Sequence, residues 1–300
     1  MGENNWRGSQ YATELNKAKD IVRNCQECGG TGIIKKSVIN YINYSARTLS
    51  YLDDADDKQA GLEEKEQATE HSKTFKENPT NSTFGFCPCR IESEHKQELI
   101  KGNFQPTLTN LRISSIVHRD IVIVNHKKID ARSFAKYYLR KFPDAMENGI
   151  GCNFFGPYSS GKTYMAQILA SHIISRRYTA HYTPLFLLID TLSKCNGNDR
   201  LFGEIIGTDF LIIDDVGSEQ AFRKSYCGEL AYYLKQRINR RKITLYISSV
   251  YNNAEEMLNH YDSLFYNVMI ERNMEVQFKT KLFSKKLNQT RLDKFLKRAT

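Results

Sequence analysis

The sequence lacks the features that mark membrane and exported proteins. No apolar run approaches the roughly 20 residues that a bilayer-spanning helix needs. The start, MGENNWRGSQ, has no apolar signal-peptide core, and Trp6 stands where a myristoylation signal requires serine or threonine. We therefore expect a cytoplasmic protein. Without an export signal, the seven cysteines are expected to be thiols or metal ligands and not structural disulfides.

The chain is long enough for one large domain and a smaller one. It has 300 residues and a net charge of +9. An excess of positive charge favours nucleic acid or another acidic partner, although many basic proteins bind neither.

A regular pattern begins at residue 149 and predicts an α/β domain over residues 149–300. Apolar runs alternate with helical stretches, an order that predicts a parallel sheet with helices on both faces. The expected strands are 150–155, 184–190, 209–214, 243–250 and 274–278. The expected helices are 162–177, 218–240 and 254–272.

Residues 1–105 have a different character and predict a separate N-terminal module, followed by a connecting segment over 106–148. The polar stretch 53–83 predicts a solvated helix and a flexible loop. Near the start, four residues fall on one face of a predicted helix: Tyr11, Leu15, Ala18 and Val22. This stripe is equally compatible with docking on a partner and with packing inside the module.

The stretch NFFGPYSSGKTYMAQ fits the phosphate-binding pattern G-x-x-x-x-G-K-[ST] between an apolar run and a helix. Its glycines allow backbone N–H groups to surround phosphates at a helix N-terminus. Lys162 is expected to reach the β- and γ-phosphates, and the Thr163 hydroxyl to bind Mg²⁺. The expected nucleotide-binding residues are Gly156, Pro157, Tyr158, Ser159, Ser160, Gly161, Lys162 and Thr163.

A second motif, DFLIIDDVGSE, agrees with the first. Four apolar residues end in two aspartates, so a buried strand would bring both carboxylates to the edge of the sheet where ligands bind. Asp214 is expected to hold the Mg²⁺ shell and Asp215 to orient or activate a water. Together the two motifs predict an ATP-binding P-loop fold.

Two cysteine pairs have the spacing of zinc ligands. Cys25 and Cys28 form a C-x-x-C knuckle, and Cys87 and Cys89 form a tighter pair. A closed site of four thiolates would be structural, and four ordinary thiols are the alternative. His71 and His95 are weaker candidate ligands. Three other cysteines lie in or near apolar patterns and are expected to be core residues: Cys152, Cys195 and Cys227.

Basic and aromatic residues mix after the predicted P-loop helix. Arg176, Arg177 and Tyr178, with Tyr182 nearby, could follow a single DNA strand by charge and stacking. A solvated helix end, with cations favourably placed at its C-terminus, explains the same residues equally well.

LIIDDVGSE followed by ITLYISS resembles the DnaC/DnaI helicase-loader and IstB transposition-helper group of AAA+ proteins. Arg237, seven residues before Thr244, matches the arginine of the family's intervening helix. CQECGGTGII followed by CPCR is similar to the cysteine head of many phage and bacterial loaders, which the IstB helpers generally lack. Only about twenty residues follow the last predicted strand, so no full AAA+ helical lid is expected, again as in the loaders.

The chain departs from the family at three positions. Ser249 stands where the family has a sensor asparagine, and Arg272 lies one turn beyond the family's arginine before the last strand. Ser284 corresponds to a late arginine that contacts the γ-phosphate. The resemblance implies that Asp215, Ser249 and Arg272 are the catalytic residues. These departures imply either that hydrolysis is slow or that the sensor and arginine roles have moved to other residues.

The resemblance implies an ATP-dependent helicase loader with ATP, Mg²⁺ and Zn²⁺ as cofactors. Its partners would be a replicative helicase and single-stranded DNA, with homo-oligomers forming in the ATP-bound state. The alternative is a transposition helper that acts with a transposase on duplex DNA.

Overall fold

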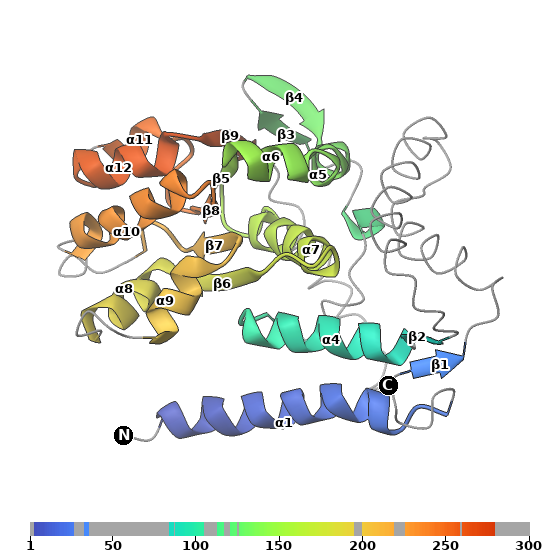
Figure 1. Cartoon of the computed structure of the whole chain (residues 1–300). Helices are drawn as coiled ribbons and strands as arrows, with labels where there is room; N and C mark the ends of the chain where they lie inside the picture. The colour runs from blue at the N-terminus through green and yellow to red at the C-terminus, as the bar shows by residue number, and fades with distance from the viewer. Residues whose placement is uncertain are drawn as a thin grey trace, which may run out of the picture. The chain divides into compact units, whose positions relative to one another are not determined.

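The computed structural model divides into two compact units (Figure 1). It describes residues 3–26, 33–35, 84–86, 88–104, 113–116, 121–124, 126–194, 200–218, 226–258 and 260–279. One unit comprises Met1–Ile100 and Arg112–Ser114, and the other comprises Lys101–Leu111 and Ser115–Thr300. The polar stretch 53–83 lies outside the described residues. None of the helices in the described ranges is long and apolar enough to cross a membrane.

The smaller unit contains the predicted N-terminal helix. Its elements are α1 (Glu3–Arg23), β1 (Ile33–Lys35), β2 (Phe84–Phe86), most of α4 (Pro88–Lys101) and part of a 3₁₀ turn (Ile113–Ser115), with β1 and β2 antiparallel. Ala18 is buried, and its carbonyl accepts a hydrogen bond of 2.7 Å from the Ser93 hydroxyl of α4. Of the predicted stripe, Ala18 is therefore used inside this unit, while Leu15 and Val22 are half-buried.

The larger unit is built on a seven-stranded sheet within the described residues, in the order β4-β3-β9-β5-β8-β7-β6. The five strands from β9 to β6 are parallel, and β3 and β4 add an antiparallel edge. The strands are β3 (Ile121–Val124), β4 (Lys127–Asp130), β5 (Gly151–Phe155), β6 (Ala180–Pro184), β7 (Phe210–Asp214), β8 (Ile243–Ile247) and β9 (Asn273–Phe278). The predicted α/β fold, with a parallel sheet flanked by helices, is confirmed.

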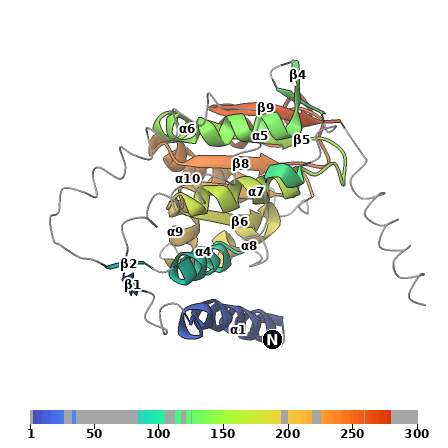
Figure 2. The same cartoon turned by 90° about the vertical axis from the view of Figure 1, so that its right-hand side faces the viewer.

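Helices cover both faces of this sheet, as Figure 1 shows. On one face lie α5 (Ala131–Arg140), α6 (Phe142–Asn148) and α7 (Lys162–Ser175), which face the viewer in Figure 2. The other face carries α8 (Leu185–Lys194), α9 (Arg200–Gly207), α10 (Cys227–Asn239), α11 (Glu255–Leu258) and α12 (Ser263–Ile270).

The segment 106–148, expected to be only a connection, instead contributes elements to the larger unit. Within its apolar stretch DIVIVNH, Ile121–Val124 form β3, whose Val122 pairs with Phe278 of β9. The helix α5 that follows begins with a side-chain cap, because the Asp130 carboxylate accepts the Ser133 N–H at 2.8 Å. The predicted boundary missed these elements because their pairing partner, β9, lies more than a hundred residues later.

The expected strand at 184–190 is wrong. The strand is β6, which ends at Pro184, and the apolar run that follows is the helix α8. Leu185, Leu188, Ile189 and Leu192 are buried at a spacing of three and four residues, which is a helical period. The short run alone could not distinguish a buried strand from a buried helix face.

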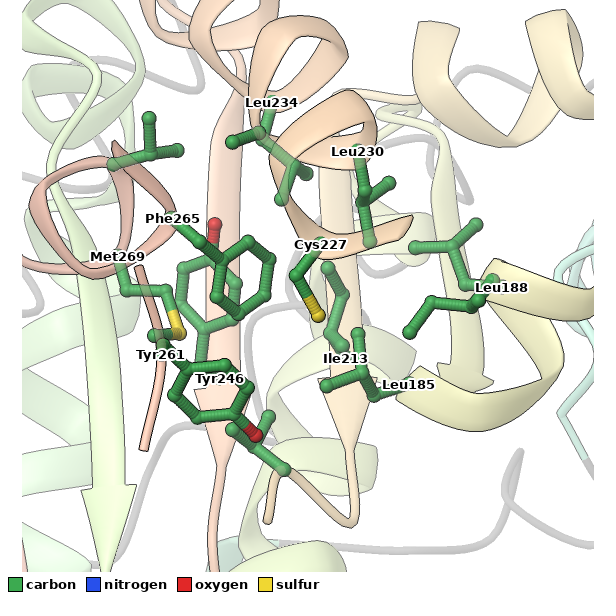
Figure 3. Close-up of a cluster of buried hydrophobic side chains, with 14 of the residues drawn as sticks. Leu185, Leu188, Ile213, Cys227, Leu230, Leu234, Tyr246, Tyr261, Phe265 and Met269 are labelled. Carbon is green, nitrogen blue, oxygen red and sulfur yellow. The ribbon is translucent and has the colours of Figure 1, made fainter. Parts of the chain in front are cut away.

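Figure 3 shows the core on this second face. Leu185 and Leu188 of α8 meet Ile213 of β7 and side chains of α10 and α12. Cys227 is in this cluster, and Cys152 is fully buried in β5, so the prediction that these two cysteines are core residues is confirmed. Cys195 lies outside the described residues.

Candidate functional site

The loop between β5 and α7 has the backbone that a phosphate cradle requires. Three of its residues have positive φ: Gly156 at 133°, Ser159 at 62° and Gly161 at 92°. A Cβ on Gly156 would lie 2.3 Å from the carbonyl oxygen of Phe278, so no other residue fits there. The loop leads directly into α7, and the N-terminus of a helix favours an anion.

Lys162, the first residue of α7, turns back into this loop. Its side chain is buried, and Nζ donates to the carbonyls of Gly156 and Pro157, both at 2.8 Å. Burial lowers the pKa of Lys162 to about 8, while the carboxylates of Asp214 and Asp215 oppose the shift. The ammonium is therefore held at the mouth of the cradle, beside two acids.

Asp214, at the end of β7, is the centre of a hydrogen-bond network. Its Oδ2 accepts from the Thr163 hydroxyl at 2.8 Å and from the Tyr182 hydroxyl at 3.0 Å. Its Oδ1 accepts the backbone N–H of Asp215 at 2.7 Å. The carboxylate is buried, so these donors offset its loss of hydration.

Asp215 follows in a left-handed conformation, with φ of 57°, which is uncommon for a residue with a side chain. Burial and the neighbouring Asp214 charge raise its carboxyl pKa, and Lys162 lowers it. A half-buried carboxylate with a raised pKa has the properties of a general base.

These residues together fit a nucleoside triphosphate with Mg²⁺. The glycine cradle and Lys162 suit phosphate oxygens, and the pairing of a hydroxyl with a carboxylate at Thr163 and Asp214 offers the oxygen ligands that Mg²⁺ takes. When bound, the metal would neutralise phosphate charge, and the chain's own part is to hold these oxygens in place. Of the predicted cradle, Tyr158 and Ser159 are exposed, Pro157 is half-buried and Ser160 is buried.

Ser249, the predicted sensor, lies at the same edge of the sheet and is half-buried. The preceding Ser248, and not Ser249, is the residue whose side chain connects the neighbouring loops. Its hydroxyl donates to the Val216 carbonyl at 2.7 Å and accepts the N–H groups of Val250 and Tyr251, both at 3.2 Å. This bridge ties the loop after β8 to the loop after β7, and the sensor role of Ser249 stays a prediction.

Arg272 does not join the residues around Lys162. Its guanidinium donates to the Asn148 carbonyl at 2.9 Å, just before β5 begins, whereas the cradle lies after β5 ends. The five residues of β5 separate the two points by about 17 Å. The structure therefore does not bring Arg272 to the cradle, and its catalytic role stays a prediction without a supporting contact. Ser284 lies outside the described residues.

Arg237 is a structural residue. Its guanidinium is buried and donates to the Thr244 hydroxyl at 3.1 Å and to the backbone carbonyl of Thr208 at 2.8 Å. It also donates to the carbonyls of Ile206 and Ile243. The arginine thus links α10 to the end of α9 and to the start of β8.

The three predicted DNA-binding residues lie at the far end of α7 from the cradle. This helix has 14 residues, which places them about 20 Å from the cradle. Arg176 donates to the carbonyl of Leu139, and the Tyr178 ring packs edge-on against Phe142 with centroids 5.1 Å apart. Only Arg177 has an exposed side chain among the three.

The zinc prediction is not tested by the described residues. Cys28 and Cys87 lie outside them, and nothing is described of the Cys89 side chain in α4. Cys25 is half-buried just after α1. Within the part of the chain that the structure describes, no three histidine, cysteine or acidic residues come together as a metal site.

Tyr182 is the site residue that sequence reasoning assigned elsewhere. It was a candidate for DNA stacking, yet its hydroxyl bonds Asp214. The register of two parallel strands brings them together, since Pro184 of β6 pairs with Asp214 of β7. Only knowledge that β6 ends at Pro184 would have revealed this contact from the sequence.

Among known proteins, several solved structures are similar to this one in fold. No family model matches the sequence, and no curated protein matches it. The structure is similar to the crystal structure of the DnaC helicase loader, at 20% identity and a TM-score of 0.41, covering 50% of this chain and 91% of that one. It is also similar to the crystal structure of DnaI, at 16% identity and a TM-score of 0.44, covering 57% and 90%.

A putative primosome component from Streptococcus pyogenes serotype M3 gives a similar match. The identity is 13% and the TM-score 0.45, with 59% of this chain and 89% of that one covered. At these values the similarity to DnaC/DnaI-type proteins concerns the fold alone and covers only part of this chain.

Proposed function

We propose that this chain binds ATP with Mg²⁺ and hydrolyses it at the cradle after β5. The observation that carries the proposal is the meeting of Lys162, Thr163 and Asp214 at one edge of the sheet. Phosphate-binding loops need a buried cation, a helix N-terminus and a hydroxyl beside a carboxylate, and this edge provides all of them.

In the proposed reaction, Lys162 and the loop N–H groups bind the β- and γ-phosphates, while Thr163 and Asp214 hold the metal. Asp215 accepts the proton of the attacking water, a role supported by its raised pKa. Phosphate release from ATP by the purified chain, measured with Mg²⁺ and with a chelator, tests this step. Release that does not depend on Mg²⁺ would contradict it.

We further propose that the ATPase serves as a helicase loader that binds a hexameric replicative helicase and single-stranded DNA. The motifs LIIDDVGSE and ITLYISS support either member of this group, and the cysteine head, which the IstB helpers generally lack, favours the loader over a transposition helper. The larger unit would bind ATP and DNA, and the smaller unit would dock on the helicase.

The test is co-purification of the full chain with the replicative helicase of its host, in ATP and in ADP. Lys162→Ala, which lacks the phosphate contact, is the matched control. We expect retention with ATP and DNA binding that falls steeply with salt, because phosphate contacts release counterions. Preference for duplex DNA and retention of a transposase instead would support the transposition-helper function.

The zinc site stays part of the proposal. If Cys25, Cys28, Cys87 and Cys89 hold one structural zinc, elemental analysis of the reduced protein should find about one zinc per chain. A Cys87→Ser/Cys89→Ser variant should lose the metal and keep nucleotide binding, since the cradle lies in the other unit. Metal-free protein from a chelator-free preparation would contradict the site.

A further inference from the structure

The carboxylate of Asp214 has a third supporting residue besides Thr163 and its own backbone neighbour. The Tyr182 hydroxyl donates to Oδ2, the same oxygen that accepts from Thr163, while Oδ1 accepts the Asp215 N–H. Both oxygens are therefore fixed, and the plane of the carboxylate is set by donors from three elements. A carboxylate with only the Thr163 contact and the backbone contact would be held less firmly.

Tyr182 is suited to this position because it remains a neutral donor. A tyrosine hydroxyl is uncharged at physiological pH, and this one donates to Asp214 Oδ2 at 3.0 Å. A lysine or arginine in its place would bring a positive charge that competes with a metal cation. A neutral hydroxyl orients the carboxylate and leaves its charge available.

The backbone of Tyr182 is itself held from outside the sheet. β6 is an edge strand, and the segment Lys101–Phe104 lies against it. The Tyr182 N–H donates to the Gly102 carbonyl at 2.8 Å, and its carbonyl accepts from Asn103 Nδ2 at 2.9 Å. The Phe104 ring lies 6.2 Å from the Tyr182 ring, centroid to centroid.

This segment lies so close to β6 that the residue types at two of its positions are restricted. A Cβ on Gly102 would lie 2.3 Å from the Ala180 carbonyl oxygen, and Asn103 has a positive φ of 62°. Asparagine tolerates this conformation better than most residues with side chains. The segment also begins where α4 ends, so it forms a covalent connection between the two units.

We propose that Tyr182 is a positioning residue that orients Asp214 for Mg²⁺, and that Gly102 and Asn103 hold Tyr182 in that position. The inference rests on the proposed ATP and Mg²⁺ site. It adds a residue from a neighbouring strand and a segment from the start of the larger unit to the magnesium chemistry. Hydrogen-bond partners of metal-binding carboxylates typically contribute about 10- to 100-fold to metal affinity.

The test uses the full chain and a fluorescent ATP analogue, whose binding is followed as Mg²⁺ is added. Tyr182→Phe removes only the hydroxyl and should raise the half-saturating Mg²⁺ concentration roughly tenfold. Nucleotide affinity in chelator should stay within about twofold of the wild type, because Tyr182 does not contact the cradle carbonyls. The matched control is Tyr138→Phe, which removes a buried hydroxyl bonded to the Ile150 carbonyl at 3.1 Å and should leave the Mg²⁺ midpoint unchanged.

Asn103→Gly tests the supporting segment without touching the carboxylate. Glycine keeps the positive φ and removes the side-chain bond to Tyr182, so the Mg²⁺ midpoint should rise by a smaller factor, roughly threefold. This variant also keeps the test decisive if Tyr182→Phe fails to fold.

The outcomes separate the two proposals. An unchanged Mg²⁺ midpoint in both variants, with a wild type that responds to Mg²⁺, would overturn the role of Tyr182 alone. A loss of affinity in chelator as large as the loss in Mg²⁺ would show a merely structural tyrosine and would overturn it too. A wild type that binds no nucleotide, or ignores Mg²⁺, would overturn the proposed function instead.

Discussion

Two buried cations in the larger unit, Lys162 and Arg237, are held in different ways. Arg237 donates to the carbonyls of Ile206, Thr208 and Ile243 and to one hydroxyl, with no carboxylate among these acceptors. Lys162 rests on the carbonyls of a loop that contains left-handed residues and lies beside Asp214 and Asp215. A compact ammonium on a flexible stem can exchange loop carbonyls for phosphate oxygens, whereas a guanidinium fixed by four acceptors cannot leave without breaking the fold.

The largest effect should come from Arg237→Met. The carbonyls of Ile206, Thr208 and Ile243 would lose a buried donor, which we expect to lower the free energy of unfolding by about 3 kcal/mol. Urea denaturation measures the change, and the exposed Arg240→Met serves as the control with an effect near zero. If Arg237→Met were as stable as the control, Arg237 would not be the structural cation of the pair.

Lys162→Ala should affect nucleotide affinity strongly and stability only slightly. Stability should change little, because the loop carbonyls can be solvated, while nucleotide affinity should fall roughly 100-fold through loss of a charged phosphate contact. Titration with a labelled nucleotide and urea denaturation of the same sample measure both quantities. Unchanged affinity would mean that the loop is not a phosphate cradle.

Asp215→Asn should separate binding from hydrolysis. The amide has the shape of the carboxylate but cannot accept the proton of water, so ATP should still bind while hydrolysis slows about 100-fold. Asp144→Asn, an exposed acid on α6, is the control. Hydrolysis at the wild-type rate would remove Asp215 from the mechanism.

The smallest effect is on pH dependence. Because the pKa of Lys162 is lowered to about 8, the free protein loses this positive charge as the pH rises through 8. Phosphate favours the charged form, so nucleotide affinity should be constant below pH 8 and fall about tenfold by pH 9. Lys162→Arg, which keeps its charge, should show no such fall, and an equal fall in both proteins would assign the titration to another group.

The same pKa has a consequence for stability with the opposite sign. A lysine whose pKa is lowered on folding destabilises the fold at pH values where it is charged in both states. That cost is full below pH 8 and is relieved as the pH rises from about 8 toward the unfolded pKa. Removing the charge in Lys162→Ala should therefore not reduce stability at neutral pH.

The sequence predicted the parts of the site that depend on local chemistry. Gly156, Gly161 and Lys162 are fixed by what a phosphate requires of a loop, and Asp214 by the end of an apolar strand. Those requirements act over a few residues, so a pattern can express them.

The rest depended on contacts between distant segments. The run at 184–190 was too short to reveal its helical period, and β6 before it carries polar residues because it is an edge strand. Tyr182 meets Asp214 only through the register of β6 and β7, and Arg176 is occupied by a carbonyl of α5. Arg272 lies at the end of β5 opposite to the cradle, and no local sequence pattern could predict that position.

The most direct measurement is a titration of the wild-type chain with a fluorescent ATP analogue, with Mg²⁺ and with a chelator. Lys162, Thr163 and Asp214 predict saturable binding that is tighter with Mg²⁺ than without it. Absence of binding, or binding that Mg²⁺ does not change, would contradict a magnesium-dependent nucleotide site at this edge of the sheet.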